Sequence, residues 1–135
     1  MQTKSDFKIL AIDDDKDILL LLKYNLESEG YYVETASSGK KGISIAQKIN
    51  PNLMLVDIMM PEMDGIQTCI KLREIDNLKS SYIIFLTART EEYSEVAAFD
   101  AGADDYITKP IKPRALLSRI NSVSYTHLTL PTNHP

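Results

Sequence analysis

Residues 53–65 read LMLVDIMMPEMDG, and this stretch decides the fold. Its opening residues are all apolar, which is typical of a strand buried on both faces of a parallel sheet. The apolar run ends at Asp57, and the following Pro61 and Asp64-Gly65 indicate a turn. The stretch therefore predicts a central strand that presents a carboxylate at its carboxyl end.

Similar apolar runs recur along the chain and alternate with helical patterns. The expected strands lie near residues 7–13, 32–36, 52–57, 82–87 and 104–107, and the expected helices near 15–29, 39–49, 65–75, 91–101 and 112–123. Strict alternation favours an α/β fold with a parallel sheet covered by helices on both faces. In such sheets the carboxyl ends of the strands share one edge, where ligands bind.

Charged residues stand where three of these runs stop. Asp13-Asp14 follow the first run, Asp57 ends the third, and Lys109 follows the last, just before Pro110. Folding is expected to bring these groups together at one sheet edge. Because crowded carboxylates repel each other unless a cation joins them, the pattern predicts an oxygen-ligated metal site beside a lysine.

Length and composition exclude several classes of protein. The chain has 135 residues, which suits a single domain with its own core. A net charge of -4 without a basic stripe argues against nucleic-acid binding by this segment. No apolar run reaches membrane-spanning length, and residues 1–8 lack the apolar core of a signal peptide, so we expect a cytoplasmic protein without membrane contact.

Cysteine and histidine are nearly absent from the body of the chain. Cys69 is the only cysteine, which excludes an intrachain disulfide, and we expect it in the core. Both histidines, His127 and His134, lie close to the C-terminus. Catalytic Ser/His or Cys/His pairs and His-rich zinc sites are therefore excluded from the body.

The last residues differ in character from the rest. From residue 124 the sequence SYTHLTLPTNHP loses helical periodicity and most of its charge. We expect residues 1–123 to form the domain. We interpret residues 124–135 as a tail outside the fold, either a non-native sequence or a disordered extension.

Four stretches, residues 12–15, 57–65, 87–89 and 102–110, together resemble the receiver domain of bacterial response regulators. The resemblance covers about residues 7–123, in order and at the family's spacing. It implies a flavodoxin-like (βα)5 fold, a doubly wound parallel five-stranded sheet with strand order 2-1-3-4-5.

The resemblance implies a Mg²⁺-dependent phosphoacceptor site. Asp57 would receive the phosphoryl group, while the Lys109 ammonium and the Thr87 hydroxyl would bind its oxygens. The expected metal ligands are Asp14 and Asp57 directly, Asp13 through a bound water, and the backbone carbonyl of Met59. A cis peptide before Pro110 would aim Lys109 inward.

Simpler interpretations exist for each of these residues. An acidic triplet before a helix is a common N-cap pattern, and we expect one of Asp13, Asp14 and Asp15 to be such a cap. Asp57 alone would pass for a turn residue and Lys109 for a solvated loop lysine. Thr87 suits a strand whatever its function.

The function implied is a switch that accepts a phosphoryl group from a histidine kinase or a histidine phosphotransfer protein. Phosphorylation would move Thr87 and Tyr106 and alter partner binding at the face formed by the expected helix 91–101, strand 104–107 and helix 112–123. Its output would be a downstream effector domain or a homodimer. The chain would catalyse its own phosphorylation and dephosphorylation without being an enzyme for other substrates.

Two alternatives stay open. A degenerate receiver would act as a constitutive protein-binding module, although the complete site argues against this. A hydrolase with aspartyl-phosphate chemistry would need a second carboxylate two residues after the nucleophile, where Met59 stands.

The expected first helix carries more leucines than one face needs. Helical spacing predicts that Ile18, Leu21, Leu22 and Leu26 face the core. Leu20 then points nearly the opposite way, beside the expected site, where the family docks its phosphodonor.

The resemblance also bears on how long the phosphoryl group persists. The family's attacking water passes between the residues two after the phosphoacceptor and two after the hydroxyl residue. These residues are Met59 and Arg89 here. Neither activates a water well, so we expect a long-lived phosphoryl group.

Overall fold

The computed structural model describes residues 2–88 and 95–129 of the chain. Five strands form one parallel sheet in the order β2-β1-β3-β4-β5, so the predicted fold class and strand order are confirmed. The strands are β1 Lys8–Ile12, β2 Tyr32–Ala36, β3 Leu53–Asp57, β4 Tyr82–Thr87 and β5 Asp105–Thr108. The helices are α1 Lys16–Ser28, α2 Gly39–Ile49, α3 Gly65–Arg73, α4 Glu95–Asp100 and α5 Pro113–Thr129, with 3-10 turns at Lys4–Asp6 and Asp76–Leu78.

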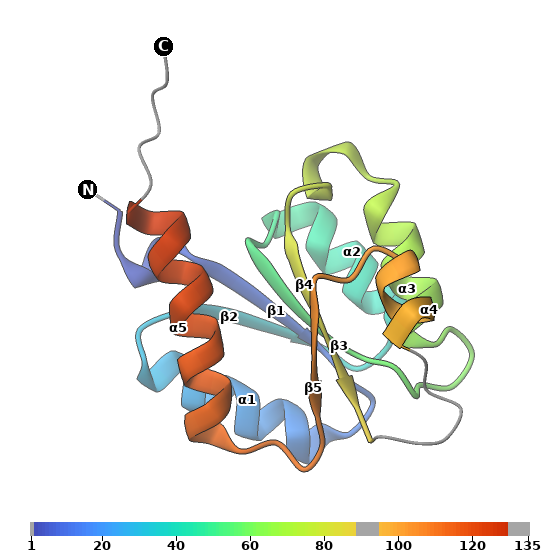
Figure 1. The fold of residues 1–135 in the computed structure, drawn as a ribbon, viewed down its shortest axis with the longest axis horizontal. Helices are drawn as coiled ribbons and strands as arrows, with labels where there is room; N and C mark the ends of the chain where they lie inside the picture. Colours follow the sequence, from blue (N-terminus) through green and yellow to red (C-terminus); the bar gives the residue numbers. More distant parts are fainter. Residues whose placement is uncertain (1, 89–94, 130–135) are drawn as a thin grey trace.

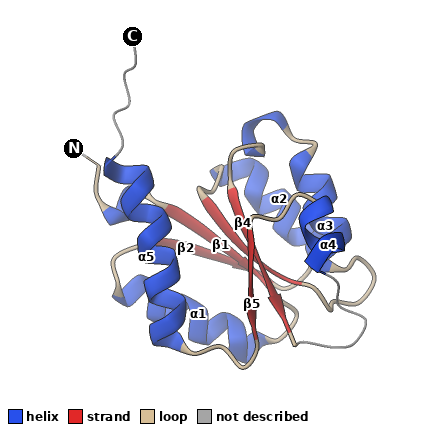
Figure 2. Cartoon of the chain, viewed as in Figure 1, coloured by secondary structure: helices blue, strands red, loops and turns tan. Residues whose placement is uncertain are grey.

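The sheet is sandwiched between two helical layers (Figure 1). Helices α1 and α5 cover one face, while α2, α3 and α4 cover the other. Figure 2 shows the strands as the middle layer between these helices. Among the described residues, no helix combines the length and the apolar character needed to span a membrane.

The central strand β3 is buried along its whole length, as the apolar run predicted. Because successive side chains of a strand point to opposite faces, β3 contributes to two cores. Leu53 and Leu55 pack in the cluster under α1 and α5, while Met54 and Val56 pack in the cluster under α2 and α3. Cys69 is fully buried in the second cluster, as expected.

The predicted buried face of α1 is wrong at two positions, because Leu21 is exposed and Leu19, which was not predicted, is buried. The structure buries Leu19, Leu22 and Leu26, whereas Leu21 is 38% exposed. Leu20 is 66% exposed, which confirms that part of the prediction. A run of apolar residues longer than one helix face leaves the rotation of the helix undetermined, because several phases bury a similar number of leucines.

The predicted end of the last helix at residue 123 is also wrong, since α5 continues to Thr129. Nothing between residues 124 and 129 is a glycine or proline that would stop a helix. Ser124 is buried, and its hydroxyl is 2.6 Å from the hydroxyl of Tyr31. The helix shows that residues 124–129 are folded but does not test whether they belong to the native domain, so the domain boundary at residue 123 stays a prediction.

Candidate functional site

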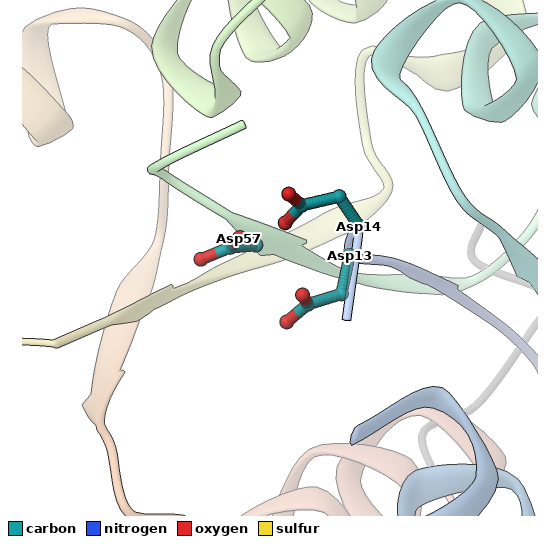
Figure 3. Close-up of side chains that lie close together, drawn as sticks. All are labelled: Asp13, Asp14 and Asp57. Carbon is teal, nitrogen blue, oxygen red and sulfur yellow. The ribbon is translucent and has the colours of Figure 1, made fainter. Parts of the chain in front are cut away.

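Three carboxylates meet at the carboxyl ends of the neighbouring strands β1 and β3 (Figure 3). Asp13 and Asp14 directly follow β1, and Asp57 is the last residue of β3. These strands are neighbours, with Ile12 opposite Val56, so the residues that follow lie side by side. One oxygen from each carboxylate lies within 4.8 Å of the others. The sequence prediction that folding brings these groups together is therefore confirmed.

Lys109 joins this cluster from the end of β5. Its ammonium nitrogen lies 3.0 Å from Asp13 Oδ2 and 3.1 Å from Asp57 Oδ1. The Lys109 backbone N–H donates to the carbonyl of Thr87 at 2.7 Å, which ties the lysine to the end of β4. The peptide bond between Lys109 and Pro110 is cis, as expected. The lysine beside the site is thus an inward-facing group rather than a solvated loop residue.

Asp13 is held more firmly than the sequence suggested. Its side chain is completely buried, and its Oδ1 accepts a hydrogen bond of 2.9 Å from the backbone N–H of Asp15. Its Oδ2 pairs with Lys109. Neither contact was predicted, because sequence spacing shows which residues share an edge but not which atoms meet there.

Burial and neighbouring charge perturb the acid-base behaviour of the site. Desolvation, with repulsion from Asp13, raises the pKa of Asp57 to about 6 even though Lys109 opposes the shift. Burial alone would lower the pKa of Lys109, but its bonds and attraction to Asp13 and Asp57 raise it. Lys109 therefore stays protonated, whereas burial and the neighbouring Asp13 disfavour the ionised form of Asp57.

The donor set suits a hard divalent cation. Three carboxylates and the Lys109 ammonium leave two net negative charges in a largely buried cluster. The buried Oδ2 atom of Asp13 is paired with the Lys109 ammonium by charge, but it accepts no hydrogen bond from the residues that the structure describes. Mg²⁺ prefers oxygen ligands and a few carboxylates with water in the remaining positions, so the residues fit this metal.

The loop after Asp57 is fixed by close packing against α3. Gly65 lies so near that an added Cβ would stand 2.2 Å from the Asp57 carbonyl oxygen. The Gly65 N–H also donates to the carbonyl of Ile58 at 2.8 Å. Asp64 caps α3 by accepting from the backbone N–H of Gln67. The requirement for glycine at residue 65 was missed from the sequence, where Asp64-Gly65 indicated only a turn.

The two remaining predicted residues flank the carboxylates. Thr87 is buried at the end of β4, one residue beyond Leu86, which lies opposite Asp57 in the sheet. The Met59 side chain is exposed in the loop after β3. The roles of Thr87 as a phosphoryl donor group and of the Met59 carbonyl as a ligand remain predictions. Arg89 lies outside the described residues.

A shallow cavity lies away from this cluster, between β5 and α5. Its volume is about 360 Å³, and Tyr106, Pro110, Lys112 and Arg119 are among the residues that line it. Arg119 forms an ion pair with Asp105 across its rim. The ring of Tyr106 packs edge-on against Phe99 of α4, with ring centres 6.5 Å apart. This face therefore joins α4, β5 and α5 through side-chain contacts.

Comparison with known proteins places these features in a family. Residues 9–121 match the family described as the response regulator receiver domain. The chain is 42% identical over 116 residues to the alkaline phosphatase synthesis transcriptional regulatory protein PhoP of Bacillus subtilis, covering 86% of this chain and 48% of that protein. It is 40% identical over 141 residues to the transcriptional regulatory protein ResD of the same organism, covering 99% and 58%. The chain thus spans about half the length of these relatives.

Solved structures give the same result. The chemotaxis protein CheY4 of Vibrio cholerae superposes with a TM-score of 0.82 at 31% identity, covering 87% of this chain and 98% of that one. A CheY-like receiver domain protein from Methanospirillum hungatei superposes with a TM-score of 0.80 at 36% identity, covering 87% and 92%.

Proposed function

This chain belongs to the response regulator receiver domain family, and we propose that it is a phosphorylation-activated switch that accepts a phosphoryl group on Asp57. The observation that carries the proposal is that Asp57 lies close to Asp13, Asp14 and Lys109 at one edge of the sheet. A histidine kinase or histidine phosphotransfer protein would be the donor. The Asp57 carboxylate attacks phosphorus, the bond from phosphorus to the donor's imidazole nitrogen breaks, and that nitrogen keeps the electron pair.

The residues around Asp57 have complementary tasks in this transfer. The Lys109 ammonium, already 3.1 Å from Asp57, binds a phosphoryl oxygen through charge and hydrogen bonding. The Thr87 hydroxyl donates to another of these oxygens. Burial of Asp57 keeps bulk water away from the reacting oxygen.

We propose Mg²⁺ as the cofactor, held directly by Asp14 and Asp57, through water by Asp13, and by the backbone carbonyl of Met59. The ion supplies neutralisation of charge on the transferring oxygens. Lys109 and the carboxylates hold the site in shape around it.

Removing Asp14 tests the metal site. Asp14→Ala is expected to weaken Mg²⁺ binding roughly tenfold or more, since a direct ligand is lost. It should also raise the melting temperature of the metal-free protein, because one of three crowded carboxylates is gone. Isothermal titration calorimetry and thermal unfolding in chelator measure the two effects. Asp76→Ala, a change at an exposed acid between α3 and β4, is the matched control. Unchanged affinity in Asp14→Ala would exclude Asp14 as a ligand.

The phosphodonor is proposed to dock on α1. Leu20, Leu21 and Tyr24 are 66%, 38% and 73% exposed and lie close together on this helix, at most four residues apart. Because α1 begins just after Asp13–Asp15, a protein that delivers a phosphoryl group to Asp57 would approach close to the N-terminal half of this helix. An apolar patch at that place suits a protein partner.

Leu20→Ala is expected to slow phosphotransfer from a sensor kinase roughly tenfold, as loss of an interface anchor does. Phosphorylation by a small acyl phosphate should be unchanged, because that donor needs no docking surface. Stability should change by less than about 0.5 kcal/mol, whereas buried Leu22→Ala should cost about 2–5 kcal/mol. Ile70→Ala, an exposed apolar residue on α3, is the control. Kinase transfer at the wild-type rate in Leu20→Ala would remove the docking proposal.

We propose that the output acts through the face of α4, β5 and α5. The contact of Tyr106 with Phe99 and the cavity beside Arg119 support the proposal that this face changes when phosphorylation moves Thr87. A downstream effector domain or a second copy of the chain would bind there, and the relatives named as transcriptional regulators support an effector. The alternative is a constitutive binding module, which would bind its partners equally well without phosphorylation.

Three further proposals concern the setting of this function. We place it in the cytoplasm, where sensor kinases present their phosphohistidine. We assign it to residues 1–123. Direct contact with nucleic acid belongs to an effector rather than to this segment, whose chain carries a net charge of -4.

A further inference from the structure

We propose that Asp15 is a positioning residue for the phosphorylation site, and that it couples the start of α1 to the Asp13–Lys109 pair. The inference rests on the proposed function. It concerns a residue that lies outside the carboxylate cluster, which comprises Asp13, Asp14 and Asp57.

Asp15 is engaged on two sides at once. Its carboxylate caps α1, with Oδ1 accepting from the backbone N–H groups of Asp17 at 2.9 Å and Ile18 at 3.4 Å. Its carbonyl accepts from the N–H of Leu19 at 3.1 Å. Its own N–H points the other way and donates to Asp13 Oδ1 at 2.9 Å. The cap therefore fixes the direction of the N–H group that Asp13 depends on.

Asp13 transmits this constraint into the site. One oxygen of its buried carboxylate accepts a hydrogen bond from the Asp15 N–H, and the other lies 3.0 Å from Lys109 Nζ. A buried carboxylate that loses a hydrogen-bond donor must turn to find another, because an unsatisfied charged group is costly. Turning Asp13 would displace Lys109, which also contacts Asp57. The order of contacts runs from the α1 cap through Asp13 and Lys109 to the phosphoacceptor.

The role differs from that of a metal ligand or a simple cap. The Asp15 side chain is exposed, and its Oδ1 is committed to α1. A simple cap would influence only the stability of the helix. A positioning residue influences the orientation of Asp13, and loss of such an outer contact typically weakens metal binding without removing a ligand.

The test compares Asp15→Ala with Asp15→Asn, which keeps a capping side chain, and with Asp17→Ala, a neighbouring exposed acid of the same helix turn. Mg²⁺ affinity is measured by calorimetry at a temperature where circular dichroism shows each variant folded. The position of the residue-15 amide proton in the NMR spectrum of the metal-free protein reports its bond to Asp13. We expect Asp15→Ala to weaken Mg²⁺ binding roughly tenfold and to shift this proton upfield. Asp15→Asn should restore both, and Asp17→Ala should leave both unchanged.

Two results would overturn the inference. One is an Asp15→Ala protein with a lower melting temperature but Mg²⁺ affinity and amide position like the wild type, which would make Asp15 a helix cap only. The other is an Asp15→Asn protein as impaired as Asp15→Ala. Failure of the proposed function would look different, because the wild type itself would then take up no phosphoryl group while the amide shift in Asp15→Ala would still appear.

Discussion

Asp57→Asn is expected to abolish phosphorylation of the domain. With Mg²⁺ and a small acyl phosphate, the wild type should gain one phosphoryl group by intact mass, and the variant should gain none. The amide has nearly the shape of the carboxylate but is not a nucleophile, so the loss would not come from a collapsed site. Asp76→Asn, at the exposed acid far from the cluster, should label like the wild type. Full labelling of Asp57→Asn would mean that another residue is the phosphoacceptor.

The same variant is also expected to change how the free energy of unfolding of the metal-free protein depends on pH. Burial and Asp13 raise the pKa of Asp57 from 3.8 to about 6. Between these pH values the folded wild type holds a proton that the unfolded chain has released. Its free energy of unfolding should therefore fall as pH rises from about 4 to about 6, by on the order of 2–3 kcal/mol. Denaturant unfolding in chelator should show this fall in the wild type and a much smaller one in Asp57→Asn.

The placement of the site was predictable because it depends on strand ends alone. Asp13, Asp57 and Lys109 each follow an apolar run, and a parallel sheet brings those ends to one edge. The spacing of apolar runs therefore sufficed for the α/β class and for the membership of the cluster, whereas the strand order was implied by the resemblance to receiver domains. The Asp15 cap was also foreseeable as one of three candidates, since the acidic triplet precedes a helix.

The finer contacts were not predictable, because they depend on three-dimensional packing. The exposure of Leu21 follows from the rotation of α1 on the sheet, which a run of leucines leaves open. The pairing of Asp13 with Lys109 depends on the path of the chain after β5, where the Lys109 backbone bonds the end of β4. The need for glycine at residue 65 arises only because α3 begins against the Asp57 carbonyl. In each case the sequence names the residue, but a neighbour distant along the chain decides what it does.

The phosphoryl group on Asp57 is expected to be long-lived, and Met59→Asn with Arg89→Glu is expected to shorten its lifetime. In the family that this chain resembles, the attacking water passes between these two positions. The exposed Met59 side chain offers only a thioether, a weak acceptor that does not orient water. An arginine stays protonated and cannot serve as a base.

An asparagine and a glutamate at these positions would hold and polarise the attacking water. A hydrogen bond of about 1–3 kcal/mol in the transition state corresponds to a rate increase of roughly 5- to 150-fold. Loss of the phosphoryl group is followed by intact mass after removal of the donor, in the wild type, the double variant and each single variant. The Lys71→Glu variant is the control for a charge reversal elsewhere, since Lys71 lies on the exposed face of α3. A wild type that loses its phosphoryl group as fast as the double variant would show that Met59 and Arg89 do not control the approach of water.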